Sequence, residues 1–445
     1  MSRRRRKKIP QEPVELFIDD LAHDGRGVAK SNGKTVFVTA ALPGETVSAQ
    51  LINRRSKFDE AKTLSVSVSA EDRVEAQCPH FDICGGCSLQ HLQWKAQIKF
   101  KAGLLKQQLQ HFGEIKPQQW LEPLQANAWA YRRKARLGVK HVIKKGGVLV
   151  GFREKQSHFI ADIKTCHILH EKAEKLLLPL RDIIGKMDAK ARLPQIEVAI
   201  GEDCSALVFR HLDPMTEHDR TLLINFANQH AFDLYFQPKG PDTVHKVWPE
   251  NGRERLYYSL PEFNLKMAFH PMDFTQVNLE INQLMTSRAI DLLELSTEDR
   301  VLDLFCGLGN FSLPMATKAA EVVAVEGSEA MVSRGYENAT ANGLNNIQFH
   351  AADLTSDLSR KPWANQQFDK ILIDPPRSGA QEICHYLKKF NAKKIVYVSC
   401  NPATLARDAG ILKANGYRMT HAGVMDMFPH TGHVESLAVF VPVKK

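Results

Sequence analysis

Five apolar runs between residues 300 and 402 constrain the fold more than any other feature. They read RVLDLFCGLG, EVVAVEGS, FHAADL, FDKILIDPPR and KKIVYVSCNP, and each ends in a polar, Gly-rich or Pro-rich turn. Segments with helical spacing separate or precede them, and INQLMTSRAIDLLEL is expected to bury Ile281, Leu284, Met285, Ala289 and Leu292. Strands that alternate with helices predict a doubly wound parallel sheet whose ligands bind beyond the carboxyl ends of the strands. We therefore expect an α/β domain over residues 261–445.

Acidic residues stand where three successive runs end. Glu326 ends the second run, Asp353 follows the third and Asp374 follows the fourth. An acid after the second strand can accept hydrogen bonds from ribose hydroxyls, and Asp353 suits an adenine amino group. Asn310 follows Gly309, where a pyrophosphate-binding turn would have a further glycine. An ordinary strand-loop-helix without a bound cofactor could have one acid at a strand end by chance. It poorly explains acids at three successive strand ends. The set resembles the S-adenosylmethionine pocket of class I (Rossmann-like) methyltransferases, whose ligand has no phosphates.

The segment Asp374-Pro375-Pro376-Arg377 resembles in part a motif of amino-methyltransferases, (Asn/Asp)-Pro-Pro-aromatic. In that motif the acid and a carbonyl hold an exocyclic amine, and the aromatic ring stacks on the base. Here Arg377 takes the aromatic position. This departure argues against methylation of an adenine amino group.

Cys400 ends the fifth run and precedes Asn401 and Pro402. A cysteine at a strand end is usually a small hydrophobic residue, but at a ligand-binding edge it can be a nucleophile. One reaction that needs such a nucleophile is methylation of a pyrimidine carbon. Carbon 5 of uracil takes a methyl group only if a thiolate first adds to C6, and a base must then remove the C5 proton so that the thiol can leave. The target nucleotide must also lie outside the helix stack. Glu435, in GHVESLAVF, is the candidate base.

Between Glu12 and about Ala70, apolar and polar residues alternate with a period of two, and Gly-rich turns separate the runs. This pattern predicts a small β-barrel over residues 12–70. The alternating residues are Val14, Leu16, Ile18, Val36, Val38, Val47, Ala49, Leu51, Leu64, Val66 and Val68. The expected exposed basic residues are Arg26, Lys30, Lys34, Arg54, Arg55 and Lys57, which form either a solvated surface or an RNA-binding one. The stretch LAHDGRGVAKSNGKTVFVTAALPGETV resembles the TRAM domain, an oligonucleotide-binding-like (OB-like) barrel attached to RNA-modifying enzymes.

Three cysteines follow the expected barrel in CPHFDICGGCSLQ. Cys78, Cys84 and Cys87 lie close enough in sequence to bind one soft metal centre, and Cys166 is the best candidate for a fourth ligand. Cys204 lies beside an expected strand and is interpreted as a packing residue. The spacing fits structural zinc and an iron-sulfur cluster about equally. The context resembles the cluster cysteines of uracil-C5 RNA methyltransferases, which favours [4Fe-4S].

Residues 71–260 are expected to form a central α+β domain that carries this cluster. Strand-like runs flank an amphipathic stretch from Glu171 to Met187. An aromatic and basic cluster precedes them and consists of Tyr131, Arg132, Arg133, Lys134 and Arg136. The cluster is either an exposed strand edge or a surface that contacts phosphates and stacks a base, and RNA contact is slightly preferred.

The net charge indicates the kind of binding partner, and the amino-terminal sequence indicates the cellular compartment. The net charge of +9 and the sequence pI of about 9.0 favour a polyanionic partner. Polar residues follow MSRRRRKKIP where a signal peptide needs an apolar segment, so Arg3 to Lys8 is expected to be a solvated tail. No stretch reaches the roughly 18 apolar residues of a membrane span. We expect a cytoplasmic monomer without a membrane partner, whose eight cysteines serve metal binding or catalysis rather than disulfides.

Several motifs together resemble the RNA uracil-C5 methyltransferase family. They are DFTQVN, LDLFCGLGNFSLP, VEGSEAMV, DPPR, VSCNPATLARD and DMFPHTGHVES. The resemblance implies Cys400 as nucleophile and Glu435 as base. It also implies cofactor contacts through Gln276, Phe305, Asn310, Glu326, Asp353 and Asp374. His270 stands where the family has a small residue, a minor departure.

The combination of a TRAM-like barrel and a cysteine cluster resembles those family members that act on 23S ribosomal RNA. The resemblance thus implies transfer of a methyl group from S-adenosylmethionine to one uridine of that RNA. A tRNA-specific enzyme shares all the catalytic parts and stays an alternative. So does a non-catalytic RNA-binding protein of ribosome assembly, which need not keep Cys400, Glu435 and Gln276 together. A DNA cytosine-C5 methyltransferase is disfavoured because its nucleophile follows a proline, whereas Cys400 follows Ser399.

Overall fold

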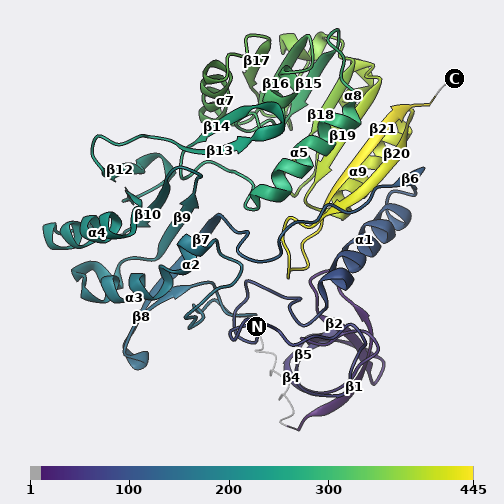
Figure 1. Ribbon diagram of the computed structural model, residues 1–445. Helices are drawn as coiled ribbons and strands as arrows, with labels where there is room; N and C mark the ends of the chain where they lie inside the picture. The colour runs from purple at the N-terminus through teal and green to yellow at the C-terminus, as the bar shows by residue number, and fades with distance from the viewer. Residues whose placement is uncertain (1–11, 444–445) are drawn as a thin grey trace, which may run out of the picture. The chain divides into compact units, whose positions relative to one another are not determined.

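The computed structural model describes residues 12–443, so the basic tail from Arg3 to Lys8 lies outside the described residues (Figure 1). Contacts divide the chain into two compact units. The barrel unit contains the described residues up to Lys101, together with Arg153–Phe159 and Phe428–His433. The sheet unit contains Ala102–Phe152, Ile160–Met427 and the described residues from Val434 onward. The expected division at residues 70 and 260 stays a prediction.

The barrel unit contains a closed barrel with the strand order β1-β2-β3-β5-β4. The strands are β1 (Val14–Leu21), β2 (Gly27–Ser31), β3 (Lys34–Thr39), β4 (Thr46–Arg54) and β5 (Phe58–Val68). Alternate residues point inward, and the core consists of Leu16, Ile18, Ala29, Val36, Val38, Ala41, Val47, Ala49 and Ala61. The closed five-stranded barrel fits the predicted OB-like domain.

Two residues of β5 depart from the predicted alternation. Leu64 is 56% exposed and Val68 is 54% exposed. Thr63 pairs with Ala49 and Ser65 pairs with Ser48, so Leu64 is the extra residue of a β-bulge. A bulge changes which side chains face inward, and the simple period of two therefore fails along this strand.

The barrel unit continues beyond the barrel into the cysteine segment. Leu21 and Leu42 form a second apolar cluster with Leu89, Leu92 and Ala96. The first two come from the barrel region, Leu89 and Leu92 precede helix α1 (Trp94–His111), and Ala96 lies in its first turn. The barrel and the segment that follows the three cysteines therefore share one core.

The sheet unit begins with a six-stranded sheet and a separate two-stranded one. The larger sheet has the order β12-β11-β10-β9-β7-β8. Its strands are β7 (Lys134–Val142), β8 (Gly147–Gly151), β9 (Gln195–Ile200), β10 (Ser205–Arg210), β11 (Asp233–Gln237) and β12 (His245–Trp248). The pair is β13 (Leu256–Leu260) and β14 (Leu265–Phe269), and the helices are α2 (Glu171–Glu174), α3 (Leu177–Lys186) and α4 (Glu217–His230). These elements agree with the predicted mixture of strands and helices.

An eight-stranded sheet forms the rest of the sheet unit, with the order β17-β16-β15-β18-β19-β21-β20-β6. Its strands are β6 (Gln119–Trp120), β15 (Arg300–Leu304), β16 (Glu321–Glu326), β17 (Ile347–Ala351), β18 (Lys370–Ile373), β19 (Lys394–Ser399), β20 (Tyr417–Met425) and β21 (Glu435–Pro442). The helices of this part are α5 (Leu279–Leu293), α6 (Ser312–Ala316), α7 (Glu329–Ala341), α8 (Gln381–Phe390) and α9 (Pro402–Ala414), several of which lie against the sheet in Figure 1. The predicted α/β sheet is confirmed.

The strand order contains two features that position a site. The first two parallel strands, β15 and β16, lie on one side of a switch point and β18 lies on the other, so loops diverge at the carboxyl end of β15. β21 runs antiparallel between β19 and β20, whereas β15 to β19 are parallel. Val434 and Glu435 therefore enter the sheet at the edge where the parallel strands end.

Residues 119–124 cover the outer side of β20. β6 pairs with His421 and Ala422, and the amide of Leu124 donates to the carbonyl of Val424 at 3.1 Å. Gly423 allows this approach, because a Cβ there would lie 2.7 Å from the Cβ of Leu121. The edge strand thus has a partner along part of its length.

Helix α5 forms where the sequence predicts it, but its buried face differs in part. Ile281, Met285 and Ala289 are buried as predicted, whereas Leu284 is 42% exposed and Leu292 is only half-buried. Ile290 and Leu293 complete the buried face instead. A helix face is about 100° wide, and apolar residues at its margin are not distinguished by spacing alone.

Candidate active site

The loop after β15 is held in an unusual backbone conformation. Phe305 has φ 65° and Gly309 has φ 96°, both in the left-handed region. A Cβ at Gly309 would lie 2.4 Å from the side chain of Leu313, so only glycine fits there. Glu326 at the end of β16 accepts hydrogen bonds from the amides of Gly307 (3.1 Å) and Ser328 (3.0 Å). Hydrogen bonds to Glu326 therefore join the loop after β15 to the end of β16 at the switch point.

The three predicted acids lie at neighbouring strand ends, as expected. Glu326 ends β16, Asp353 follows β17 and Asp374 follows β18. The side chain of Asp353 accepts bonds from the amide and hydroxyl of Thr355, and these bonds lower its pKa. Burial raises the pKa of Asp374 to about 7. Carboxylates in three different environments thus lie along the edge that binds ligands in sheets of this kind.

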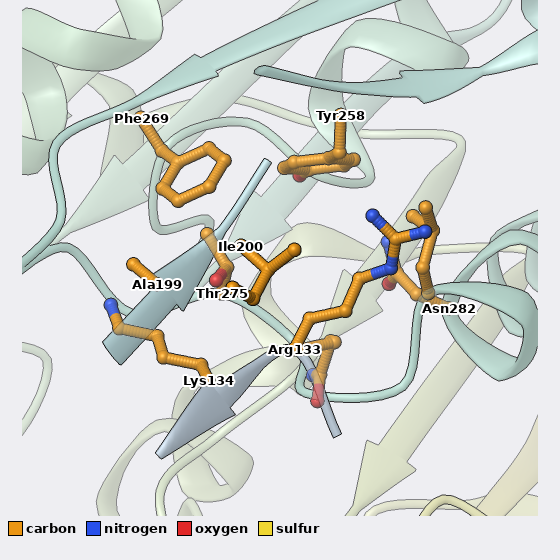
Figure 2. Close-up of a pocket in the computed structure, with 10 residues that line it drawn as sticks. Arg133, Lys134, Ala199, Ile200, Tyr258, Phe269, Thr275 and Asn282 are labelled. Carbon is orange, nitrogen blue, oxygen red and sulfur yellow. The ribbon is translucent and has the colours of Figure 1, made fainter. Parts of the chain in front are cut away.

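Gln276 lies in a pocket beside this edge, together with several residues that sequence reasoning did not assign to it. Figure 2 shows the rings of Tyr258 and Phe269 on one side of the pocket and the side chains of Arg133 and Lys134 on the other. Asn282 completes the wall near Arg133. The pocket combines aromatic faces with cationic and amide groups.

A hydrogen-bonded amide pair joins the pocket to the loop after β15. Asn310 donates to the side-chain oxygen of Asn282 at 2.9 Å, and the amide of Asn282 donates back at 3.0 Å. The hydroxyl of Tyr258 donates to the same Asn310 oxygen at 2.8 Å. The side chain of Asn310 is therefore engaged in hydrogen bonds to Asn282 and Tyr258. A ligand beside this loop would meet the backbone of Asn310 instead.

The predicted aromatic and basic cluster divides between core and pocket. Tyr131 is only 6% exposed and cannot stack a base as it stands. Lys134 to Gly138 of β7 pair with β9, whereas β8 pairs only with Gly138 to Val142, so the cluster end of β7 has a strand partner on one side. Burial lowers the pKa of Lys134 to about 8, and its ammonium donates to the carbonyl of Asp273. The burial of Tyr131 excludes base stacking by that ring, and RNA contact by the basic residues of the cluster stays a prediction.

Cys400 and Glu435 face each other at the end of two paired strands. Ser399 of β19 pairs with Ser436 of β21, so the antiparallel register places Cys400 opposite Glu435. Glu435 is buried and the thiol is partly exposed. Burial, together with the charges of Glu435 and Asp374, raises the pKa of Cys400 to about 11, and the charge of Arg377 acts in the opposite direction. The two groups predicted to act in sequence therefore share one small site.

The loop with Arg377 is fixed next to the thiol. Asn401 caps helix α9 by accepting from the amide of Ala403, and its own amide donates to the carbonyl of Arg377 at 3.1 Å. The hydroxyl of Thr404 donates to the same carbonyl at 3.4 Å. Arg377 is thus the nearby cation that favours the thiolate, a role that its sequence position did not reveal.

The four cysteines predicted to bind a cluster divide between the units. Cys78, Cys84 and Cys87 lie in the barrel unit, and Cys166 is buried in the sheet unit. Burial, together with the charges of Cys84 and Cys78, raises the pKa of Cys87 to about 12, so these three thiols are near one another. Among residues 12–443, no group of three or more His, Cys, Asp or Glu side chains is arranged to hold a metal ion.

None of the helices within residues 12–443 combines the length and the apolar composition that a membrane-spanning helix needs.

A Rossmann-like sheet with three acids at its strand ends, a partly exposed thiol and a facing carboxylate is the arrangement expected of a methyltransferase that uses a cysteine nucleophile. A model of the family described as tRNA (Uracil-5-)-methyltransferase matches residues 253–442. The chain is 52% identical to the 23S rRNA (uracil(1939)-C(5))-methyltransferase of Alcanivorax borkumensis, over 99% of each chain. The same named enzyme of Hahella chejuensis is 52% identical over 98% of this chain and 99% of its own. The chain belongs to this family of uracil-C5 RNA methyltransferases.

A solved structure has a similar fold. The tRNA (uracil-54, C5)-methyltransferase of Pyrococcus abyssi, in complex with S-adenosyl-L-homocysteine, superposes with a TM-score of 0.74. It is 23% identical in sequence, and the match covers 96% of this chain and 100% of that one. The likeness supports the fold described above over nearly the whole chain.

Proposed function

We propose that this protein is a 23S rRNA methyltransferase that transfers a methyl group from S-adenosylmethionine to C5 of uridine 1939 (the position named for its relatives). The observation that carries the proposal is the facing pair of Cys400 and Glu435 at the ligand-binding edge of a methyltransferase sheet. Ribosomal RNA as the substrate agrees with the positive net charge and implies work in the cytoplasm. We propose that the enzyme acts as a monomer.

The reaction divides between the two facing groups. The thiolate of Cys400 adds to C6 of the uracil ring and moves electron density to C5, which then takes the methyl group. Glu435 accepts the proton from C5, the bond between C6 and sulfur breaks, and the thiolate is regenerated. S-adenosylmethionine supplies the methyl group as a sulfonium. The register of β19 and β21 suits this order of events because both groups reach one ring.

Six residues would hold S-adenosylmethionine at the switch point. They are Gln276, Phe305, Asn310, Glu326, Asp353 and Asp374. The donor set fits the cofactor because carboxylates match ribose hydroxyls and an adenine amino group, and only the end of Met331 lies within 4 Å of a Cβ placed on Gly307. Asn310 would act through its backbone, since Asn282 and Tyr258 engage its side chain.

We assign a [4Fe-4S] cluster to Cys78, Cys84, Cys87 and Cys166 on the basis of their spacing and of the family resemblance. The mutual influence of the first three thiols supports this assignment. The uracil chemistry needs no electron transfer, so we assign folding and RNA shaping to the cluster. Purification without oxygen, followed by measurement of iron, sulfide and zinc, tests the assignment. Stoichiometric zinc without sulfide would contradict it.

A tRNA uracil-C5 methyltransferase is the second candidate, because the matching family model and the similar solved structure both carry tRNA in their descriptions. The deciding experiment measures transfer of labelled methyl groups to separated tRNA and unmodified 23S rRNA. We expect label in 23S rRNA alone, at one uridine that primer extension or mass spectrometry locates. Label in tRNA would favour the second candidate, and label in neither RNA would favour a non-catalytic role.

A further inference from the structure

The loop Arg377–Ala380 connects β18 to helix α8 and lies outside the strands of the sheet. Arg377 itself is exposed. The charges that act on the thiol of Cys400 include the negative ones of Glu435 and Asp374 and the positive one of Arg377. Because no strand register fixes this loop, the place of the positive charge depends on the side chains that bind the loop.

One face of helix α9 carries polar side chains that bind this loop. Asn401, which caps the helix, donates from its side-chain amide to the carbonyl of Arg377 at 3.1 Å, and the hydroxyl of Thr404 lies 3.4 Å from the same oxygen. The guanidinium of Arg407 donates to the carbonyl of Ser378 at 2.9 Å. Residues three apart on a helix are neighbours on its surface. The loop is therefore held against the first two turns of α9.

Asp408 is the buried end of this contact. It is fully buried, and one carboxylate oxygen accepts from the amide of Ala380 (2.7 Å) and from the hydroxyl of Tyr397 on β19 (2.6 Å). The other oxygen pairs with the guanidinium of Arg407 at 2.7 Å. A carboxylate in a core is costly unless hydrogen bonds and a cation match it, and here both are present. Asp408 thus connects the loop to the strand that precedes Cys400 and to the helix that follows it.

The loop and the helix are in close contact at Gly379. This residue has φ 80°, in the left-handed region that favours glycine. A Cβ there would lie 2.6 Å from the carboxylate of Asp408 and 2.4 Å from the guanidinium of Arg407. Because the partners of Asp408 fix its carboxylate, even a methyl group at Gly379 would displace the loop.

We propose that Asp408 is a positioning residue that holds the loop of Arg377 beside the thiol of Cys400, an inference that deepens the proposed function and rests on it for its role in catalysis. Asp408 is buried, so it acts through the loop rather than by touching a substrate. A cation near the thiol favours the thiolate, which is the form that adds to C6. Displacement of the loop should therefore weaken the positive potential at Cys400.

The test measures the ratio of two alkylation rates at Cys400 in the full chain without RNA. Iodoacetate is an anion and iodoacetamide is neutral, so a nearby cation raises the rate of the first relative to the second. The two reagents are similar in size, so a change in the thiolate fraction or in access to the thiol alters both rates alike. Mass spectrometry of the peptide with Cys400 measures both rates at low salt, where screening is weakest.

We expect Arg377→Gln to lower the ratio at least about twofold and Asp408→Asn to lower it by most of that factor. An amide can accept on one side only, so Asp408→Asn loses part of its hold on the loop. The double variant should have a ratio no lower than Arg377→Gln alone, because both changes remove the same effect. Asp219→Asn is the matched control, since that fully buried aspartate accepts from two backbone amides near helix α4 and should leave the ratio unchanged.

Gly379→Ala repeats the test from the side of the loop, because it displaces the loop and keeps Asp408. It replaces Asp408→Asn should that variant fail to fold. A lowered ratio in Arg377→Gln with an unchanged ratio in these two variants would show that the positioning role is wrong. An unchanged ratio in Arg377→Gln would also overturn the proposal, since its charge would then not act on the thiol. The proposed function is judged separately, because methylation of 23S rRNA by Cys400→Ala would contradict it whatever the ratios are.

Discussion

Ser399 and Ser436 lie directly opposite each other in the antiparallel pair of β19 and β21, and the hydroxyl of Ser436 donates to the carbonyl of Ser399 at 3.4 Å. Cys400 follows the first serine and Glu435 precedes the second. The ladder thus aligns the proposed nucleophile with the proposed base. Facing positions at the end of such a pair have Cβ atoms about 5 Å apart, which leaves both groups within reach of one pyrimidine ring.

Replacing Cys400 by alanine should abolish adduct formation and methyl transfer while binding of cofactor and RNA is kept. The reason is that the register places Cys400 opposite Glu435, whereas Cys306, which follows β15 at the same edge, is buried. RNA containing 5-fluorouracil should trap the unmutated enzyme as a band on a denaturing gel and should not trap Cys400→Ala. Cys384→Ala is the matched control, because that cysteine is buried in helix α8 and should still allow trapping. Appreciable turnover by Cys400→Ala would exclude it as nucleophile.

Reactivity of Cys400 in the enzyme without RNA should rise steeply with pH. An ordinary cysteine has a pKa of about 8.5. Burial, followed by the charges of Glu435 and Asp374, raises the pKa of Cys400 to about 11. Below that pKa the thiolate fraction increases about tenfold per pH unit, so alkylation by iodoacetamide should do the same between about pH 7 and 10. Mass spectrometry of the peptide with Cys400 measures the rate.

Two substitutions should move this profile in opposite directions. Arg377→Gln removes the charge that opposes the increase, so the pKa should rise and alkylation at fixed pH should slow. Glu435→Gln removes a negative charge, so the pKa should fall and alkylation should speed up. A flat pH profile, or equal effects of the two variants, would contradict the electrostatic account of this site.

Arg73→Met should destabilise the barrel unit by about 3 kcal/mol at neutral pH, because it leaves a buried carboxylate unpaired. Burial raises the pKa of Glu45, but hydrogen bonds from Arg73 and from the amides of Leu42 and Ala70 outweigh it and leave that pKa lowered. A lowered pKa stabilises the fold above the ordinary value of about 4.3, and this stability is lost as the pH falls through the native pKa. The penalty of the substitution should therefore shrink on acidification.

Urea unfolding at several pH values tests this prediction. Arg192→Met is the matched control, since Arg192 pairs with Asp213 on the surface and the unfolding midpoint should stay unchanged. A penalty for Arg73→Met that is independent of pH would indicate lost packing rather than an unpaired carboxylate.

Replacing Lys30, Arg55 and Lys57 together by glutamine should weaken RNA binding and reduce its salt dependence. Of the six basic barrel residues, Arg26 pairs with Asp24 and Glu60, and Lys34 and Arg54 lie near Asp59. In the described part of the chain the other three make no ion pair and are exposed. Each lost phosphate contact should lower the slope of log affinity against log salt by about 0.7 to 0.9. An unchanged slope in filter-binding titrations would assign the barrel another purpose.

The sequence predicts the sheet and the strand-end groups well because each depends on local pattern. Glu326, Asp374 and Cys400 stand at strand ends that apolar runs define, and parallel strands bring these ends to one edge. The position of β21 between β19 and β20 is not a local property, so the register that pairs Cys400 with Glu435 could be seen only in the structure.

Other features depend on tertiary context in the same way. The bulge at Leu64 interrupts the alternation that predicted an inward-facing side chain there. The burial of Tyr131 was not indicated by its position in an aromatic and basic cluster. The contacts of Gln97 with His430 join segments that are far apart in sequence, and a glutamine within a helix pattern gives no sign of them. Asn282 could have been suspected, because a polar residue within the apolar face of α5 needs a partner.

The cover over β20 also bears on how this protein avoids self-association. An open edge strand presents free amide and carbonyl groups on which another copy can add a strand, and nine residues are enough for that. Residues 119–124 occupy those groups between His421 and Asp426, next to the strand that carries the base. The covering segment lies far from β20 in sequence, so the edge stays open until distant parts of the chain meet during folding. Gly423 therefore protects the protein from aggregation, since any side chain at that position would push the cover away.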